Sequence, residues 1–328
     1  MPARRAAAEL ITSRGIDYVP AVVLDATENA AERFVTFFTD NIRNPHSRRA
    51  YHKRVLDFFD WCDEQRLDFT DIKSFHVSAY IEYLLAQGKS KSYVKQALAA
   101  IRMLFDWLII GQVCAINPAQ AVRGPKLVVK KGKTPTLDDD QMRELYAAID
   151  TSHVVGLRDR ALISTMLFTF GRVGAVDLMN VEDYYPSGKR WYVRLHEKGG
   201  KEHEMPAHSK LEEHLDAYIT AAAIAEDRKG PLFRTTYRRT KQLTENRMSQ
   251  PDVWRMVRRR AKDAGIAPPI GCHTFRASGI TNYLCHGGTL EKAMNMANHE
   301  SARTTGLYDH SGDELTAEEI QKVWWDGI

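Results

Sequence analysis

The sequence predicts a mainly helical protein of two domains, the second of which is a mixed α/β domain with a small antiparallel sheet. Its 328 residues are too many for one small domain. Apolar residues recur at helical spacing through the first third of the chain, until a segment rich in proline and glycine breaks the pattern. Helical spacing then returns around one stretch of strand-like alternation. We therefore expect an extension over residues 1–28, a helical domain over 29–112, a linker over 113–135 and a second domain over 136–328.

The composition is that of an ordinary globular protein, with 44% hydrophobic and 27% charged residues. The net charge of +4 is only mildly basic, so a polyanionic partner must be inferred from where the charges lie. We expect no secretory signal and no membrane span, because no apolar run is long enough. We then expect the four cysteines to be reduced thiols, which predicts a cytoplasmic protein.

Three apolar stripes at helical spacing predict the main helices of the first domain, an all-helical bundle. The first stripe comprises Tyr51, Val55, Phe58, Phe59 and Cys62, the second Val77, Tyr80, Ile81, Leu84 and Leu85, and the third Val94, Leu98, Ile101, Leu104, Phe105 and Leu108.

The linker is marked by helix-breaking residues and by its charge. Pro118, Gly124, Pro125, Gly132 and Pro135 interrupt the periodicity. Its basic residues, which no acid accompanies, are Arg123, Lys126, Lys130, Lys131 and Lys133.

The second domain is expected to begin with a helix capped by Thr136, followed by a helix over about 157–170. Apolar alternation over 191–206 around a Lys-Gly-Gly-Lys turn predicts a hairpin. Helices return from Asp252, and the last is expected over 314–325.

Four basic clusters favour contact with nucleic acid. Two surround predicted helix starts, where backbone N–H groups and basic side chains both favour phosphate; the third is the linker and the fourth lies near residue 258. A solvated helix face explains any single cluster equally well, whereas four together favour a clamp around DNA. The candidate DNA-binding residues are Arg43, Arg48, Arg49, Lys53, Lys89, Lys91, Lys95, Lys126, Lys130, Lys131, Arg258 and Arg259.

The segment from residue 271 to 310 carries the most specific motif. It contains His273-x-x-Arg276, then His299 and Tyr308 nine positions apart, with a pair of threonines between them. This pattern resembles the carboxy-terminal signature of the tyrosine recombinases, the phage integrase family. The resemblance implies that Tyr308 is a nucleophile and that His299 hydrogen-bonds the phosphate it attacks.

The resemblance extends over nearly the whole chain. Arg172 falls where the family has its first arginine, and Lys198 falls where it has a catalytic lysine on a hairpin. The first domain and the linker also resemble those of the family, which implies a SAM-like DNA-binding bundle before the catalytic domain. Lys201 is close enough to compete with Lys198 for its role.

The chemistry of phosphodiester cleavage explains these residue types. Negative charge grows on the non-bridging oxygens in the transition state, so Arg172 and Arg276 are a natural clamp. A phenol with a pKa of about 10 must lose its proton as it attacks, and His273 is a plausible acceptor. The departing 5′ oxygen needs a proton, which we assign to Lys198.

The resemblance also implies the product and the partners. A 3′-phosphotyrosine keeps the bond energy, so rejoining needs neither ATP nor a metal, and we expect no cofactor. The implied partners are double-stranded DNA with an inverted-repeat core site, a tetramer on that DNA built through the carboxy-terminal helix, and accessory DNA-bending or directionality proteins. Association with the bacterial nucleoid follows.

Two departures from the family pattern are visible. The acid that the family has three positions after its first arginine is replaced by Ala175, so we expect either that Asp177 or Glu182 fixes Arg172 instead or that the site is tuned differently. The family's glycine two positions before that arginine is replaced by Phe170.

The sequence also admits three other interpretations. Cys272-His273 and Cys285-His286 suggest zinc, but adjacent ligands rarely converge on one ion, and the cysteines are expected to be buried thiols. An accessory DNA-binding protein that lost catalysis is the main alternative function. A relaxing type IB topoisomerase shares the chemistry but usually lacks this amino-terminal bundle.

Overall fold

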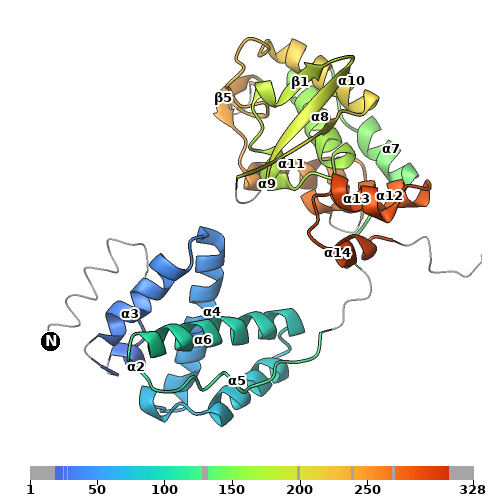
Figure 1. The fold of residues 1–328 in the computed structure, drawn as a ribbon. Helices are drawn as coiled ribbons and strands as arrows, with labels where there is room; N and C mark the ends of the chain where they lie inside the picture. The colour runs from blue at the N-terminus through green and yellow to red at the C-terminus, as the bar shows by residue number, and fades with distance from the viewer. Residues whose placement is uncertain are drawn as a thin grey trace, which may run out of the picture. The chain divides into compact units, whose positions relative to one another are not determined.

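The computed structural model describes residues 19–24, 26–27, 29–127, 132–197, 200–237, 240–267 and 270–309. They form two compact units that divide between Val128 and Val129, and each has its own hydrophobic core (Figure 1). Lys130, Lys131, Lys198 and the helix predicted over 314–325 lie outside the described residues.

The first unit is a bundle of helices, as the apolar stripes predict. Asn44 caps α4 by accepting from two backbone N–H groups, and Ser90 caps α6 in the same way from one. The buried residues of all three stripes lie in one core. The elements are α2 (Ala21–Leu24), α3 (Ala30–Thr36), a π turn (Phe37–Asn41), α4 (Pro45–Glu64), a 3-10 turn (Phe69–Asp71), α5 (Ser74–Ala86) and α6 (Lys91–Ile110).

Segments on either side of the bundle also pack on it. Val23 in α2 is buried in the bundle core, although residues 1–28 were expected to be an extension. Val113, Ala119 and Val122 are buried in the same core, and they belong to the segment assigned to the linker. Burial of these apolar residues attaches both segments to the first unit.

The second unit is mainly helical with two small antiparallel sheets, which confirms the predicted fold class. Its helices are α7 (Asp139–Ala147), α8 (Val154–Phe168), α9 (Val173–Val176), α10 (Ser209–Ala222), α11 (Gln250–Asp263), α12 (Cys272–Cys285), α13 (Leu290–Met296) and α14 (Ala302–Gly306), with a 3-10 turn at Val181–Asp183. Its strands are β1 (Tyr184–Ser187), β2 (Arg190–Glu197), β3 (Lys201–Pro206), β4 (Arg234–Thr236) and β5 (Leu243–Arg247).

The predicted hairpin is confirmed, because β2 and β3 pair antiparallel with Glu197 opposite Lys201. The alternation along β2 buries Val193, Leu195 and Glu197 on one face. Helices α12, α13 and α14 gather at one end of this unit (Figure 1).

The first helix of this unit begins two residues later than the Thr136 cap predicted. Leu137 is buried and its N–H donates to the Ser278 hydroxyl at 2.8 Å, which holds this residue outside the helix. Asp138 then caps α7 by accepting from the N–H of Gln141 at 2.8 Å. Among the described helices, none combines the length and the apolar character needed to span a bilayer.

Candidate active site

Five of the six predicted catalytic side chains meet in the second unit. Arg172 lies between α8 and α9, His273 and Arg276 lie one turn apart on α12, His299 follows α13, and Tyr308 follows α14. Lys198 lies outside the described residues.

The Tyr308 hydroxyl is paired with a histidine. Only 8% of Tyr308 is exposed, and its hydroxyl oxygen lies 2.9 Å from Nε2 of His273. Burial raises the pKa of Tyr308, while the charges of Arg276 and Arg172 oppose that rise. Partial burial and the same two arginines lower the pKa of His273, which favours a neutral ring at pH 7. A neutral imidazole at this distance can accept the proton of the phenol.

His299 also lies beside Tyr308. Its ring is nearly parallel to that of Tyr308, with centroids 6.2 Å apart and an interplanar angle of 9°. Nδ1 is 2.8 Å from the hydroxyl of the buried Thr305, which leaves Nε2 available to a ligand. Burial, followed by the charges of Arg276 and Arg172, lowers the pKa of His299 to about 4. His299 is therefore a neutral hydrogen-bonding group at pH 7.

Arg276 supplies a buried positive charge. It is 1% exposed, and its two terminal nitrogens donate to the carbonyl oxygens of Phe170 and, at 2.6 Å, of Ala297. Burial lowers its pKa to about 10, so the guanidinium stays charged at pH 7. Within the described residues no carboxylate pairs with Arg276, and its Nε has no hydrogen-bond partner. A buried cation held only by neutral carbonyls favours an anionic ligand.

The backbone conformation of Phe170 sets the direction of its carbonyl group, which accepts from Arg276. Phe170 has φ +51°, the left-handed conformation for which glycine is preferred, and it occupies the position at which the family has glycine. Its ring is accommodated because residue 279 is glycine. A Cβ at Gly279 would lie 2.8 Å from two ring carbons of Phe170 and 2.3 Å from the carbonyl oxygen of Leu167. Phe170 thus adopts a backbone conformation that glycine favours.

Arg172 is held by a carboxylate that the sequence analysis did not propose. Its Nη1 donates to Oε2 of Glu197 at 2.9 Å, and its Nη2 donates to the carbonyl oxygen of Asn298 at 3.4 Å. The expectation that Asp177 or Glu182 fixes Arg172 is therefore wrong. Asp177 instead lies near Arg247, and its burial raises its pKa to about 6. The inward position of Glu197 in the alternation of β2 is the signal that was missed.

The hairpin of β2 and β3 also contacts the segment that leads to His299. The ring Nε2 of His203 lies 3.1 Å from the carbonyl oxygen of Met296. Lys201, the alternative general acid, has its ammonium 3.9 Å from the carboxylate of Glu300, and both side chains are well exposed. The assignment of the general acid to Lys198 stays a prediction.

Two backbone contacts position the segment that carries Tyr308. The hydroxyl of Thr281 on α12 donates to the carbonyl oxygen of Tyr308 at 3.1 Å. The N–H of Gly132 donates to the carbonyl oxygen of Leu307 at 3.0 Å. The first contact holds the chain at Tyr308 beside α12, which carries His273, and the second joins the preceding residue to the segment that leads into α7.

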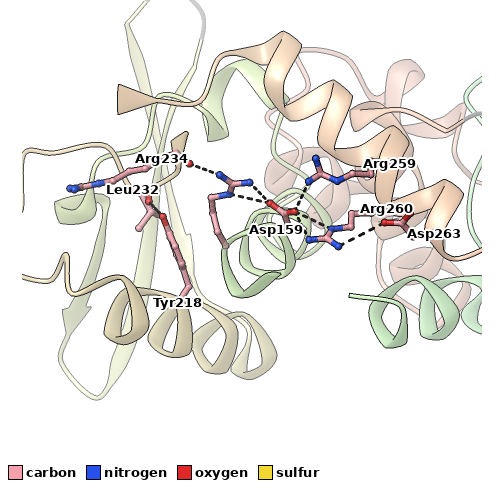
Figure 2. A network of polar contacts seen from close by, with 8 residues as sticks. Asp159, Tyr218, Leu232, Arg234, Arg259, Arg260 and Asp263 are labelled. Carbon is pink, nitrogen blue, oxygen red and sulfur yellow. Dashed lines mark hydrogen bonds and ion pairs between the residues drawn. The ribbon is translucent and has the colours of Figure 1, made fainter. Parts of the chain in front are cut away.

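A buried carboxylate joins the helices that lead into the arginine clamp. Figure 2 shows Asp159 of α8 in contact with both Arg259 and Arg260 of α11. Its Oδ2 lies 3.1 and 2.8 Å from their Nη2 atoms. Asp159 Oδ1 lies 2.6 Å from Nη2 of Arg158, whose Nη1 donates to the carbonyl oxygen of Arg234 at 2.6 Å. This network ties α8, which precedes Arg172 in the chain, to α11, which precedes α12.

The predicted DNA-binding residues lie mostly at exposed positions near helix starts. Arg48 is an exception because it is half-buried and its Nε donates to the carbonyl oxygen of Ile42 at 3.1 Å. Arg259 is exposed on one side and paired with Asp159 on the other. The exposed candidates are Arg43, Arg49, Lys53, Lys89, Lys91, Lys95, Lys126, Arg258 and Arg259, and their contact with DNA stays a prediction.

The cysteines are free thiols in different environments. Cys272 is buried, which raises its pKa to about 11, whereas Cys285 is exposed, so the expectation that both are buried is wrong for Cys285. No group of three or more histidine, cysteine or acidic side chains converges as a metal site in the part of the chain that the structure describes.

Two family models match the chain. Residues 135–314 match the model of the phage integrase family, and residues 32–111 match that of the phage integrase N-terminal SAM-like domain.

Two similar proteins are tyrosine recombinases. Tyrosine recombinase XerC of Thermodesulfovibrio yellowstonii is 26% identical over 288 residues, which cover 84% of this chain and 91% of that protein. Tyrosine recombinase XerD of Listeria innocua is 25% identical over 267 residues, which cover 80% and 86%.

Solved structures share the fold. The XerH site-specific recombinase bound to a palindromic difH substrate, in a post-cleavage complex, has a TM-score of 0.68 at 15% identity and covers 97% of this chain and 94% of its own. A lambda integrase tetramer bound to a Holliday junction has a TM-score of 0.65 at 16% identity and covers 98% and 87%.

Proposed function

Because the chain belongs to the phage integrase family of tyrosine recombinases, we propose that it cleaves and rejoins DNA at specific sites with Tyr308 as the nucleophile. The observation that carries this proposal is the Tyr308 hydroxyl 2.9 Å from His273 Nε2, beside the charges of Arg172 and Arg276. A buried phenol paired with a neutral base and next to two cations has the groups that attack on a phosphodiester requires.

In the proposed cleavage step the phenolic oxygen of Tyr308 forms a bond to phosphorus, and the bond from phosphorus to the 5′ oxygen breaks. The phenolic proton passes to His273, and the 5′ oxygen takes a proton from Lys198. The product is a 3′-phosphotyrosine and a free 5′-hydroxyl. Rejoining is the reverse reaction with a 5′-hydroxyl from another strand, so no external energy source is required.

The two arginines and His299 would stabilise the transition state. Arg276 is fixed by two carbonyl oxygens and Arg172 by Glu197, so neither guanidinium needs to reorganise when the phosphate arrives. His299 is held through Nδ1 by Thr305, and its Nε2 would donate to a non-bridging oxygen. Removing one such donor costs about 10²- to 10³-fold in rate in well-studied enzymes.

We propose double-stranded DNA with an inverted-repeat core site as the substrate. Exposed basic side chains at the starts of α4 and α6, together with Lys126, would contact phosphates, while Arg258 and Arg259 would do so from the second unit. Among similar proteins, XerH is bound to a palindromic substrate. If these contacts are to phosphate, each charge removed lowers the slope of log affinity against log salt by about 1.

Strand exchange requires more than one active site, so we propose a tetramer on DNA. A cavity of about 840 Å³ opens beside α7 and α12, where Met142, Tyr146, Phe168 and Tyr283 are among the residues that line it. The apolar side of the helix predicted over 314–325 has the composition to fill such a cavity in a neighbouring copy. Deletion of residues 314–328 should then abolish exchange and leave cleavage of single sites; loss of cleavage as well would contradict this assignment.

The function can be tested by covalent capture. Wild-type protein is mixed with fragmented genomic DNA of its source, and adducts that survive denaturant are recovered and sequenced. A duplex with this captured sequence and a nick close to the cleavage site is then prepared. Cleavage releases the short fragment that carries the free 5′-hydroxyl, so rejoining cannot occur and the enzyme should stay attached to the DNA as an adduct. A protein that retains DNA tightly at its site but never forms an adduct would instead be an accessory DNA-binding protein.

A further inference from the structure

We propose that Glu197 is the positioning residue for Arg172, supplied by the strand that leads into Lys198. This inference rests on the proposed function and assigns to the site a residue that the sequence motif does not contain. At the position where the family has a supporting acid the chain has Ala175, which is 2% exposed and packs in the apolar core of the second unit. A carboxylate for Arg172 must therefore come from elsewhere.

The contact with Glu197 has the geometry of a strong ion pair. Its Oε2 lies 2.9 Å from Nη1 of Arg172, and the Glu197 side chain is 6% exposed whereas that of Arg172 is 43% exposed. The carboxylate thus holds the guanidinium from the protein side and leaves its other side open. A hydrogen bond between charged groups at a largely buried site is short and directional, so it restricts the orientation of the guanidinium.

Backbone contacts complete the arrangement. The Arg172 Nη2 donates to the carbonyl oxygen of Asn298, a residue with φ +47° that directly precedes His299. Glu197 and Asn298 therefore approach the guanidinium from two different segments. Together they hold the guanidinium close enough to Tyr308 and His299 for its charge to lower the pKa of both groups.

The position of Glu197 in the hairpin also connects Arg172 to the segment that carries Lys198. It is the last residue of β2 and directly precedes Lys198 in the sequence. In the family pattern the supporting acid follows the arginine on the same segment, whereas here it lies 25 positions away. Arg172 is thereby tied to the base of the turn that carries the proposed general acid.

The test compares rates of single-turnover cleavage of the nicked duplex by the full-length protein. Glu197→Gln keeps the size of the side chain and removes its charge, so the fold is retained and thermal unfolding should confirm this. Complete loss of a charged donor costs about 10²- to 10³-fold, so a misplaced donor should slow cleavage about 10- to 100-fold. The control is Glu202→Gln on β3, an exposed carboxylate that pairs with Arg194, which should stay within about twofold of wild type.

A second substrate separates an effect through Arg172 from a general effect on the hairpin. Replacing the scissile phosphate by a methylphosphonate removes the negative charge that the guanidinium stabilises. The defect of Glu197→Gln should then shrink to less than about threefold. A wild-type rate for Glu197→Gln on the normal duplex, or an equal defect on both substrates, would overturn the inference. A wild-type protein that forms no adduct would overturn the proposed function, and this inference with it.

Discussion

Replacing Asp159 by asparagine should destabilise the second unit far more than any surface change. The carboxylate of Asp159 is fully buried, and Arg158 beside it is only 4% exposed. Asparagine keeps the shape of the side chain but leaves the buried guanidinium of Arg158 without its counter-charge. Loss of one partner of a buried ion pair costs about 3–5 kcal/mol. Each kcal/mol lowers Tm by about 2–4 °C in a domain of this size, so we expect a decrease of about 6–20 °C.

Calorimetry on the full-length protein can measure this effect. The transition of the second unit should move to lower temperature, while that of the first unit stays in place and serves as an internal reference. The matched control is Asp263→Asn, because the Asp263 carboxylate is exposed and lies 3.9 Å from Arg260. Exposed pairs contribute about 0–1 kcal/mol, so this control should change Tm by less than about 4 °C. Equal decreases in the two variants would refute the reasoning.

Three further predictions concern the clamp and the histidines. Arg276→Lys should slow cleavage about 10²- to 10³-fold with near wild-type DNA binding, because one ammonium cannot replace a guanidinium that donates to two carbonyls. A decrease in the cleavage rate of less than about tenfold would contradict this prediction. Gly279→Ala should destabilise the second unit by about 1–3 kcal/mol in urea unfolding, because its Cβ meets Leu167 and Phe170, whereas Gly306→Ala, which meets nothing within 4 Å, should not. His299 has a pKa of about 4 when folded and about 6.5 when unfolded, so its contribution to stability is complete above pH 6.5 and is lost as pH falls toward 4. Wild type should therefore lose about 2 kcal/mol more than His299→Gln between pH 8 and pH 5, and equal losses would contradict the assignment.

Much of the fold followed from the sequence because the relevant patterns are local. The stripe from Val94 to Leu108 and the alternation from Trp191 to Met205 each report which side of a single element is buried. The start of α7 was misplaced because it depends on a tertiary contact, the hydrogen bond between the Leu137 N–H and Ser278, 141 positions away. Local propensity carries no information about such a contact.

The candidate site likewise combines residues that local spacing brings together with residues that only tertiary packing brings together. His273 and Arg276 stand one helical turn apart, so their spacing alone places them on one face of α12. The ion pair between Arg172 and Glu197 is set by how β2 packs beside α9, which Arg172 directly precedes, and no local pattern reports that packing. Phe170 departs from the family motif, and only the structure shows that its backbone is left-handed and that the absence of a side chain at Gly279 leaves room for its ring.

The central claim is that Tyr308 becomes joined to DNA, and mass spectrometry of the captured adduct tests it most directly. After digestion of protein and DNA, the nucleotide should be attached to the peptide that contains Tyr308. Tyr308→Phe should bind the captured duplex with wild-type affinity and form no adduct, because only the nucleophilic oxygen is removed. A nucleotide attached to any other residue, or an adduct formed by Tyr308→Phe, would contradict the account.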